Sequence, residues 1–194
     1  DEWIYTRTGI KERRIADADH STSDLCKVAS ERAMQAADVK PEDIDLIILA
    51  TITPDTHCPA GSNWLEAKLK CNNAVSFDIT AACSGFIFAL HVADKMIRCG
   101  VNKNVLVVAG EIMSRVVNWK ERESCILWGD GAGAAVITET DEGAEIMSTH
   151  IHTDGENGDT LLMPGGGSKT TPISYESVDK GKHFLKMIEA NKSF

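Results

Sequence analysis

The sequence predicts a layered α/β fold, because short apolar runs alternate along the chain with segments whose apolar residues recur at helical spacing. Residues Leu46–Ala50 are continuously apolar, as in a strand buried on both faces of a parallel sheet. Residues Val75–Ile79 alternate apolar and polar side chains, and Val105–Ala109 form a third short apolar run. Strands separated by helical patterns are typical of βαβ units, so we expect a sheet with helices packed on its faces.

The first helix is expected to begin after Ser21. Ser21 and Asp24 have the spacing of a capping signal, in which each residue satisfies a backbone group of the other. Five apolar residues follow at helical spacing: Leu25, Val28, Ala29, Ala33 and Ala36. Pro41 then interrupts the pattern, because proline cannot continue a helix.

A second helix is predicted shortly after the strand at Val75–Ile79. Its apolar residues recur at helical spacing at Phe86, Leu90, Ala93 and Ile97. Gly100 follows them, and glycine favours the left-handed backbone conformation with which many helices end.

The last third of the chain combines further strands with loops. Two apolar runs, 126–128 and 134–137, flank a glycine-rich segment, which predicts a strand, a turn and a strand. Another strand is expected over 144–151, whereas the polar, glycine-rich stretch 154–174 has loop composition. Residues 183–194 resume an apolar pattern, which we interpret as the start of a helix.

Composition and charge exclude several classes of protein. The 194 residues contain 20 Lys and Arg against 29 Asp and Glu, which gives a net charge of −9. That charge repels phosphate, so we expect binding neither to nucleic acid nor to a membrane surface. No apolar run reaches the roughly 20 residues of a membrane-spanning helix. The six cysteines form no C-x-x-C pair, which favours free thiols and a cytoplasmic location.

Cys83 is the strongest candidate for a reactive residue. It lies between the strand at Val75–Ile79 and the predicted helix, among the small residues Ala82, Ser84 and Gly85. Free backbone N–H groups and the positive end of the helix dipole favour an anion at this point, and the thiolate is the reactive form of cysteine. A nearby N–H group could also stabilise an oxyanion during acyl transfer. The alternative is a buried cysteine in a tight contact between helix and strand.

Two other motifs indicate weaker alternatives. Residues Gly129–Ala134 match a G-x-G-x-x-A dinucleotide fingerprint, which keeps a nicotinamide-dependent dehydrogenase as an alternative. That motif requires a following helix, however, and the next residues are β-branched. His150 and His152 share a face of an expected strand, but no third ligand is evident, so we predict no metal site.

A compact basic cluster near the N-terminus is either a solvated surface or the rim of a phosphate-binding site. Its members are Arg7, Lys11, Arg13 and Arg14.

Around Cys83 the chain resembles the β-ketoacyl-[acyl-carrier-protein] synthase III family of condensing enzymes, within the thiolase-like superfamily. Five blocks of residues carry the resemblance in one order: 1–10 with 12–16, 50–55, 77–78 with 81–86, 129–134 and 152–155. The resemblance implies a thiolase-like layered α/β/α fold. It also implies that the chain is approximately the N-terminal, nucleophile-bearing half of a family member, plus the start of the second half.

The resemblance implies an acyltransferase. Cys83 would accept an acyl group from acyl-coenzyme A, and the acyl group would then be condensed with malonyl-acyl carrier protein to begin fatty acid synthesis. Trp3 and Arg122 match the residues that sandwich the adenine of coenzyme A, and Arg7 and Thr8 match residues of its binding tunnel. No cofactor is implied, since acyl-coenzyme A is a substrate.

The resemblance also implies how the chain is divided and assembled. Residues 1–174 would be the N-terminal half without its first strand, and 175–194 a linker with the start of a truncated C-terminal half. Family members are homodimers, and we expect the strand Val105–Ala109 to pair across the two-fold axis. Family members complete the site with a histidine and an asparagine in H-Q-A-N-like and G-N-T-S-like segments, which these residues lack. This chain alone is therefore expected not to catalyse condensation.

Several alternatives share the fold but not the reaction. The chain could belong to a thiolase, a hydroxymethylglutaryl-coenzyme A synthase or a ketosynthase of secondary metabolism. It could also be a noncatalytic module for acyl binding or dimerisation.

Overall fold

The computed structural model describes residues 2–141, 143–168 and 172–187, and it divides into two compact units. The first unit joins residues 1–15, 113–129 and 152–194, and the second joins 16–112 and 130–151. The boundary expected near residue 174 stays a prediction.

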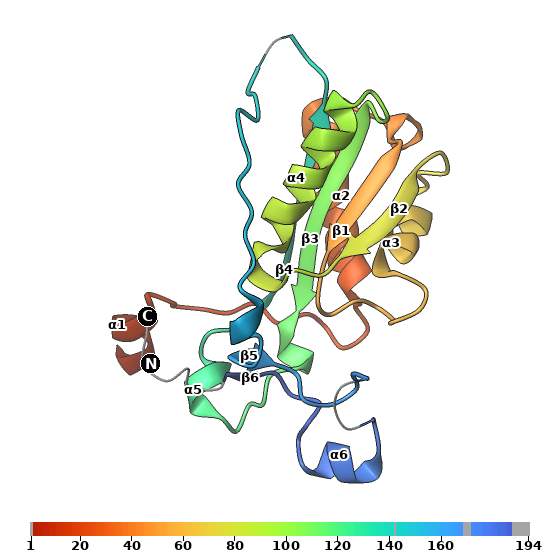
Figure 1. Cartoon of the computed structure of the whole chain (residues 1–194). Coiled ribbons are helices and arrows are strands. Elements are labelled where there is room, and N and C mark those ends of the chain that lie inside the picture. The colour runs from red at the N-terminus through yellow and green to blue at the C-terminus, as the bar shows by residue number, and fades with distance from the viewer. Residues whose placement is uncertain (1, 142, 169–171, 188–194) are drawn as a thin grey trace. The chain divides into compact units, whose positions relative to one another are not determined.

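A four-stranded sheet forms the centre of the second unit (Figure 1). Its strands are β1 (Leu46–Ala50), β2 (Val75–Ile79), β3 (Asn104–Ile112) and β4 (Asp130–Thr138), in the order β2-β1-β3-β4. The first three strands are parallel, with Leu46 opposite both Val75 and Val105, whereas β4 runs antiparallel to β3. The three strands predicted from apolar runs are therefore confirmed.

Helices cover both faces of this sheet. On one face, α2 (Thr22–Ala37) and α3 (Gly61–Leu69) pack against Ile47 and Leu49, and on the other α4 (Gly85–Arg98) packs against Leu46 and Ile48. Successive residues of β1 point to opposite faces and every residue of β1 is buried, as expected for a strand between two helical layers. The predicted α/β/α layering is confirmed.

The helix ends follow the predicted signals. The Ser21 N–H group donates to the Asp24 carboxylate over 2.8 Å at the start of α2, and a short 3-10 turn, η1 (Pro41–Asp43), follows that helix. Helix α4 ends at Arg98, and Gly100 has the left-handed φ of 70°.

The glycine-rich segment is a strand and not the predicted turn. Strand β4 begins at Asp130, and Gly131 and Gly133 pair with Glu111 and Ala109 of β3. The backbone of glycine donates and accepts hydrogen bonds in a sheet like that of any other residue. The pairing of β3 with β4 therefore continues from Thr138 back to Asp130. The expected strand at 126–128 is also wrong. Residues 126–127 form a turn directly after the short helix α5 (Arg122–Cys125), and residue 128 has no regular structure.

The strand expected over 144–151 is absent from the described residues. This segment has no partner strand, and side chains of α4 hold it instead. Arg98 donates to the carbonyl of Ile146 over 2.9 Å, and His91 Nδ1 lies 2.6 Å from the Thr149 hydroxyl.

Strand β3 cannot pair across a two-fold axis as we expected for Val105–Ala109. It lies between β1 and β4, so both of its edges are already hydrogen-bonded within the chain. Among the described residues, the free edges of this sheet belong to β2 and β4.

The first unit contains mainly short elements. They are α1 (Glu2–Thr8), η3 (Met113–Arg115), α5, η4 (Gly155–Asn157), α6 (Tyr175–Asp179) and a two-stranded sheet of β5 (Leu161–Leu162) with β6 (Lys186–Met187). The sequence patterns did not predict α1. The helix expected over 183–194 is wrong at β6, where residues 186–187 pair with β5, and residues 188–194 lie outside the described part. No helix among the described residues is long and apolar enough to cross a membrane.

Candidate active site

Cys83 lies in a turn between β2 and α4, as its sequence position predicted. A 3-10 turn, η2 (Ala82–Ser84), contains it, and α4 begins two residues later at Gly85. The thiol is free and the residue is exposed. Helix α4 has 14 residues, long enough for its first N–H groups to present a positive end to an anion near Cys83. The alternative of a buried structural cysteine is therefore excluded.

The Cys83 turn has an unusual backbone. Ala82 has a φ of 45°, in the left-handed region that residues with a side chain seldom adopt. Such a conformation persists only where the surroundings hold it. Gly85 shows one of these constraints, because a Cβ atom added there would lie 2.9 Å from the Cβ of Ala50 at the end of β1.

Two other cysteines of the second unit differ from Cys83 in their environment. Cys26 and Cys71 are buried, and the pKa of Cys26 is raised to about 12 and that of Cys71 to about 11, mainly by desolvation. The carboxylates of Asp55, Glu111 and Asp78 contribute to the raised pKa of Cys26. Burial thus makes these two thiols unreactive, whereas Cys83 is accessible.

In the first unit, two of the predicted ligand-binding residues lie beside the Trp3 ring. The Arg7 Cζ lies 4.9 Å from the centroid of the Trp3 ring, and the Arg122 Cζ lies 5.3 Å from it. Trp3 and Arg7 come from α1, whereas Arg122 begins α5, so the structure brings together residues far apart in the sequence. An exposed tryptophan beside two guanidinium groups can stack on a planar base and attract phosphate.

Arg122 makes a direct cation–π contact with Trp3, since its Cζ lies 5.3 Å from the ring centroid.

Thr8 closes the end of α1. Its hydroxyl donates to the carbonyl of Ile4 over 2.8 Å and accepts from the N–H of Ile10 over 3.1 Å. These bonds fix the chain that leads from α1 to the basic cluster. A contact of Thr8 with a ligand would compete with them.

The basic cluster does not form one uniform patch. Lys11 lies over the ring of Tyr5, with 5.4 Å between its Nζ and the ring centroid. Arg13 donates to the carbonyl of Ile126 over 2.9 Å, and Arg14 pairs with Glu12 over 3.0 Å, where both side chains are largely exposed.

Sequence patterns alone missed three carboxylates beside the ends of the parallel strands. Asp78 is in β2, Glu111 is in β3, and Asp55 follows β1. The carboxyl ends of parallel strands meet at one edge of a sheet, and this rule could have indicated them. Asp78 accepts from the N–H groups of Gly61 and Ser62 over 2.8 Å each, and so caps α3.

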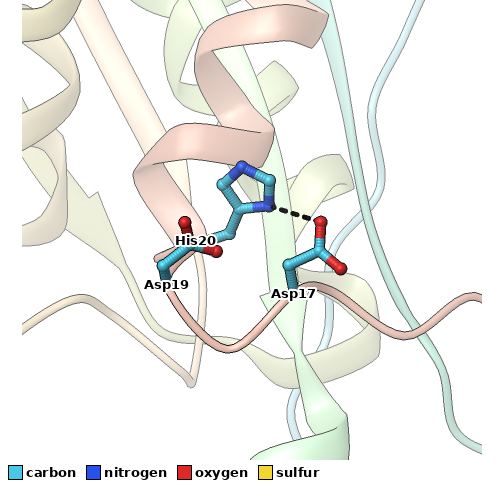
Figure 2. A group of neighbouring side chains, drawn as sticks. All are labelled: Asp17, Asp19 and His20. Carbon is cyan, nitrogen blue, oxygen red and sulfur yellow. Dashed lines mark ion pairs between the residues drawn. The ribbon is translucent and has the colours of Figure 1, made fainter.

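One further group of possible metal ligands lies at the surface of the second unit (Figure 2). Asp17, Asp19 and His20 hold one ligand atom each within 4.8 Å of the others, and Asp17 pairs with His20 over 3.8 Å. All three residues are exposed, and exposed acidic groups of this kind are common without a metal. His150 and His152 are also exposed and belong to no such group among the described residues.

The candidate site therefore has two parts, each described in its own unit. Cys83 belongs to the second unit, and Trp3, Arg7, Thr8 and Arg122 belong to the first.

Comparison with known proteins shows which family the chain is similar to. Residues 77–155, which include Cys83 and β4, match the family model of 3-oxoacyl-[acyl-carrier-protein] synthase III. The chain is 49% identical over 187 residues to the beta-ketoacyl-[acyl-carrier-protein] synthase III of Caldanaerobacter subterraneus, covering 96% of this chain and 56% of the relative. The chain thus spans little more than half the length of this relative.

Solved structures agree with this result. The 3-oxoacyl-[acyl-carrier-protein] synthase III of Aquifex aeolicus superposes with a TM-score of 0.80 at 45% identity, over 83% of this chain and 52% of that one. The beta-ketoacyl-[acyl-carrier-protein] synthase III of Thermus thermophilus gives a TM-score of 0.83 at 34% identity, over 97% of this chain and 57% of that one. The chain therefore has a thiolase-like fold and is similar over most of its length to enzymes named β-ketoacyl-[acyl-carrier-protein] synthase III.

Proposed function

We propose that the chain supplies the acyl-accepting part of a β-ketoacyl-[acyl-carrier-protein] synthase III, with Cys83 as its nucleophile. The exposed thiol at the start of the 14-residue helix α4 is the observation that carries this proposal. The Cys83 thiolate attacks the thioester carbonyl of acyl-coenzyme A and forms a tetrahedral oxyanion. Collapse of that intermediate expels the coenzyme A thiolate and leaves the acyl group on the Cys83 sulfur.

The cluster of Trp3, Arg7 and Arg122 is the proposed contact for the coenzyme. Stacking on Trp3 suits a purine, and the two guanidinium groups suit phosphate oxygens. These contacts supply local positive charge in a chain whose net charge is −9. Thr8 contributes by fixing the end of α1.

The second half of the proposed reaction takes place in the complete enzyme. The acyl group on Cys83 is condensed with malonyl-acyl carrier protein, the first elongation step of fatty acid synthesis in the cytoplasm. The reaction uses acyl-coenzyme A as a substrate and requires no resident cofactor. A homodimer of the enzyme would have to use an edge other than β3, because that strand is paired on both sides.

Intact-protein mass spectrometry after incubation with acetyl-coenzyme A tests the nucleophile. The chain should gain one acetyl group that hydroxylamine removes, and Cys83→Ser should gain none. Cys99→Ser is the matched control, because Cys99 is an exposed cysteine at the opposite end of α4. Acetylation that persists in Cys83→Ser would refute the assignment. Binding of acetyl-coenzyme A without an adduct would favour a noncatalytic binding module.

A further inference from the structure

We propose that Glu111 is a positioning residue for Cys83, which it influences through the segment Thr51–Thr53. This inference rests on the proposed role of Cys83 as the nucleophile. Glu111 lies near the carboxyl end of β3, and Thr51–Thr53 directly follow β1.

The Glu111 carboxylate accepts four hydrogen bonds from this one segment. The backbone N–H groups of Ile52 and Thr53 donate to it over 2.8 and 3.0 Å. The Thr51 hydroxyl donates over 3.2 Å, and the Thr53 hydroxyl makes the shortest contact. Thr53 Oγ1 in turn accepts from the N–H of Ile112, which follows Glu111. A single carboxylate thereby joins the ends of two neighbouring strands.

The segment that Glu111 holds contacts the start of the Cys83 turn, and the residue just before this segment contacts its end. Before the turn, the N–H of Thr51 donates over 3.2 Å to the carbonyl of Ile79, the last residue of β2. After the turn, Gly85 packs directly on Ala50, the residue before Thr51. A shift of Thr51 would therefore move the entry to the turn, and a shift of Ala50 would move its exit.

The turn itself depends on such external support. The left-handed Ala82 is adjacent to Cys83, and its strained backbone is stable only where neighbouring groups fix it. If the constraint at Thr51 is relaxed, the turn can relax toward ordinary backbone angles. The Cys83 sulfur and the neighbouring N–H groups would then lose the geometry that acyl transfer requires.

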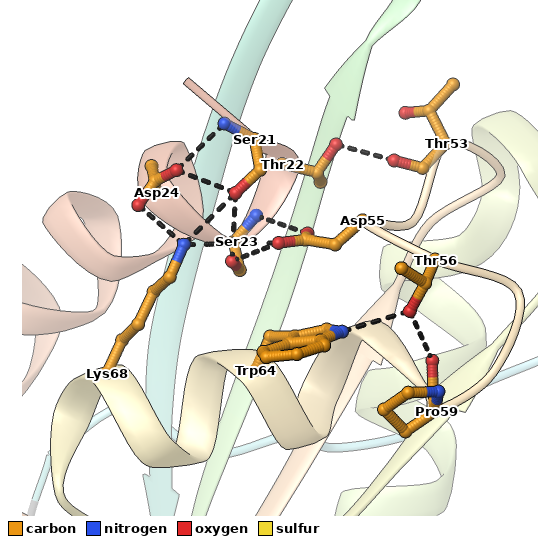
Figure 3. Close-up of polar contacts among 10 residues, drawn as sticks. All are labelled: Ser21, Thr22, Ser23, Asp24, Thr53, Asp55, Thr56, Pro59, Trp64 and Lys68. Carbon is orange, nitrogen blue, oxygen red and sulfur yellow. Dashed lines mark hydrogen bonds and ion pairs between the residues drawn. The ribbon is translucent and has the colours of Figure 1, made fainter. Parts of the chain in front are cut away.

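The other side of the loop is anchored by α2 and α3 (Figure 3). The Thr22 hydroxyl donates to the carbonyl of Thr53 over 2.5 Å, and Asp55 accepts from the N–H of Ser23 over 2.9 Å. Farther along, the Trp64 indole donates to the Thr56 hydroxyl over 3.0 Å. These hydrogen bonds do not involve Glu111, so they should hold the loop from Thr53 to Thr56 when Glu111 is changed. The effect of the change should therefore be largest at Thr51, the residue bonded to the start of the Cys83 turn.

Glu111→Gln is the appropriate test, because it preserves size and removes half of the acceptors. The amide NH₂ group would face N–H and hydroxyl donors where a carboxylate oxygen now accepts. Asp94→Asn is the matched control. Asp94, like Glu111, is a carboxylate of this unit with several hydrogen bonds, to Lys95 and Arg98 over 2.6 Å each, but it lies in the last turns of α4.

Three measurements on the purified chain separate positioning from general stability. Hydrogen exchange of the peptide spanning 79–86 should become about tenfold faster in Glu111→Gln, since charge-assisted hydrogen bonds are lost, and stay unchanged in Asp94→Asn. The rate of Cys83 acylation by acetyl-coenzyme A should fall by about tenfold in Glu111→Gln alone. Alkylation of Cys83 by iodoacetamide, which requires no oxyanion site, should change by less than about threefold.

The outcomes distinguish this inference from the function on which it rests. Unchanged exchange over 79–86 in Glu111→Gln would overturn the positioning role, whatever the acylation rate. Absence of acylation in the unmodified chain would count against the proposed function, while the exchange data would still decide the role of Glu111. If Glu111→Gln does not fold, Thr51→Val replaces it, since that variant removes only the Thr51 hydroxyl from the same network.

Discussion

Gly110 and Cys26 pack so closely that no side chain fits between them. A Cβ atom added to Gly110 on β3 would lie 2.3 Å from the Cys26 sulfur on α2. Cys26 is fully buried, so its side chain cannot move into solvent. The pair fixes how closely α2 approaches the sheet.

We expect Gly110→Ala to lower the free energy of unfolding by about 1–3 kcal/mol, the usual cost of inserting a methyl group into a packed core. Chemical denaturation measures this loss. Gly133→Ala on β4 is the control, because a Cβ added there meets nothing within 4 Å. Adding Cys26→Ala to Gly110→Ala should recover part of the loss by making room. Equal losses in the two glycine variants would contradict the packing argument.

The ion pair between Lys68 and Asp24 should make stability depend on pH. Burial by itself raises the pKa of Asp24, but hydrogen bonds from Lys68 and Ser21 outweigh it and hold this pKa well below its usual range. The folded-state pKa thus lies below the unfolded value of about 3.9, so the pair stabilises the fold fully above about pH 5 and progressively less as pH falls further. We expect Asp24→Asn to cost about 1–2 kcal/mol at pH 7 and clearly less at pH 3.5.

Denaturation at several pH values checks this expectation. Glu31→Gln is the matched control, since Glu31 is an exposed partner of Lys27 at 3.5 Å and should contribute little at any pH. A cost of Asp24→Asn that is the same at pH 7 and pH 3.5 would exclude the ionised carboxylate as its cause.

The cysteines should fall into two groups in their reaction with iodoacetamide. At pH 8 about one Cys26 thiol in ten thousand is ionised, given its pKa of about 12, and Cys71 is nearly as protected by its pKa of about 11. Both should react only after denaturation, whereas the exposed Cys58 and Cys83 should react in the native chain. Peptide mapping by mass spectrometry identifies the labelled residues. Native labelling of Cys26 as fast as Cys58 would show that the core opens readily.

The proposed binding of coenzyme A at Trp3 and Arg122 can be tested at their contact. Arg122→Ala removes a stacking partner, so affinity for coenzyme A should fall by about 2- to 30-fold, the range of a cation–π contact. Titration calorimetry measures the dissociation constant, and Lys120→Ala, an exposed neighbouring cation, should leave it unchanged. Tighter binding in Arg122→Ala would mean that the residue only blocks the base.

The buried strands and the main helices could be predicted because their patterns are local. A strand between two helical layers needs apolar residues at every position, and Leu46–Ala50 meet this condition. The strand predicted at 134–137 is the second half of β4. The first half was missed because glycine suggests a turn, whereas its pairing depends on β3 and therefore on residues distant in the sequence. The strand predicted over 144–151 is wrong for a related reason. Its residues favour a strand locally, but a strand forms only where another strand lies beside it.

The candidate site was predictable to a similar degree. The position of Cys83 follows from one strand and the helix after it, both visible in the sequence. The pairing of Trp3 with Arg122 came from the family resemblance, because no local spacing connects residues in different helices. The role proposed for Glu111 depends on three hydrogen-bonded residues at the end of another strand, a contact that a linear pattern does not contain.

The order of the strands also affects how the chain emerges during synthesis. Strand β3 ends at Ile112, and its partner β4 ends at Thr138, after the inserted residues 113–129 of the other unit. Until β4 has left the ribosome, one edge of β3 has no partner, and the apolar run Val105–Val108 borders that open edge. The nascent chain therefore passes through a period in which the apolar run of β3 can pair with a strand of another chain, and this period ends when β4 emerges.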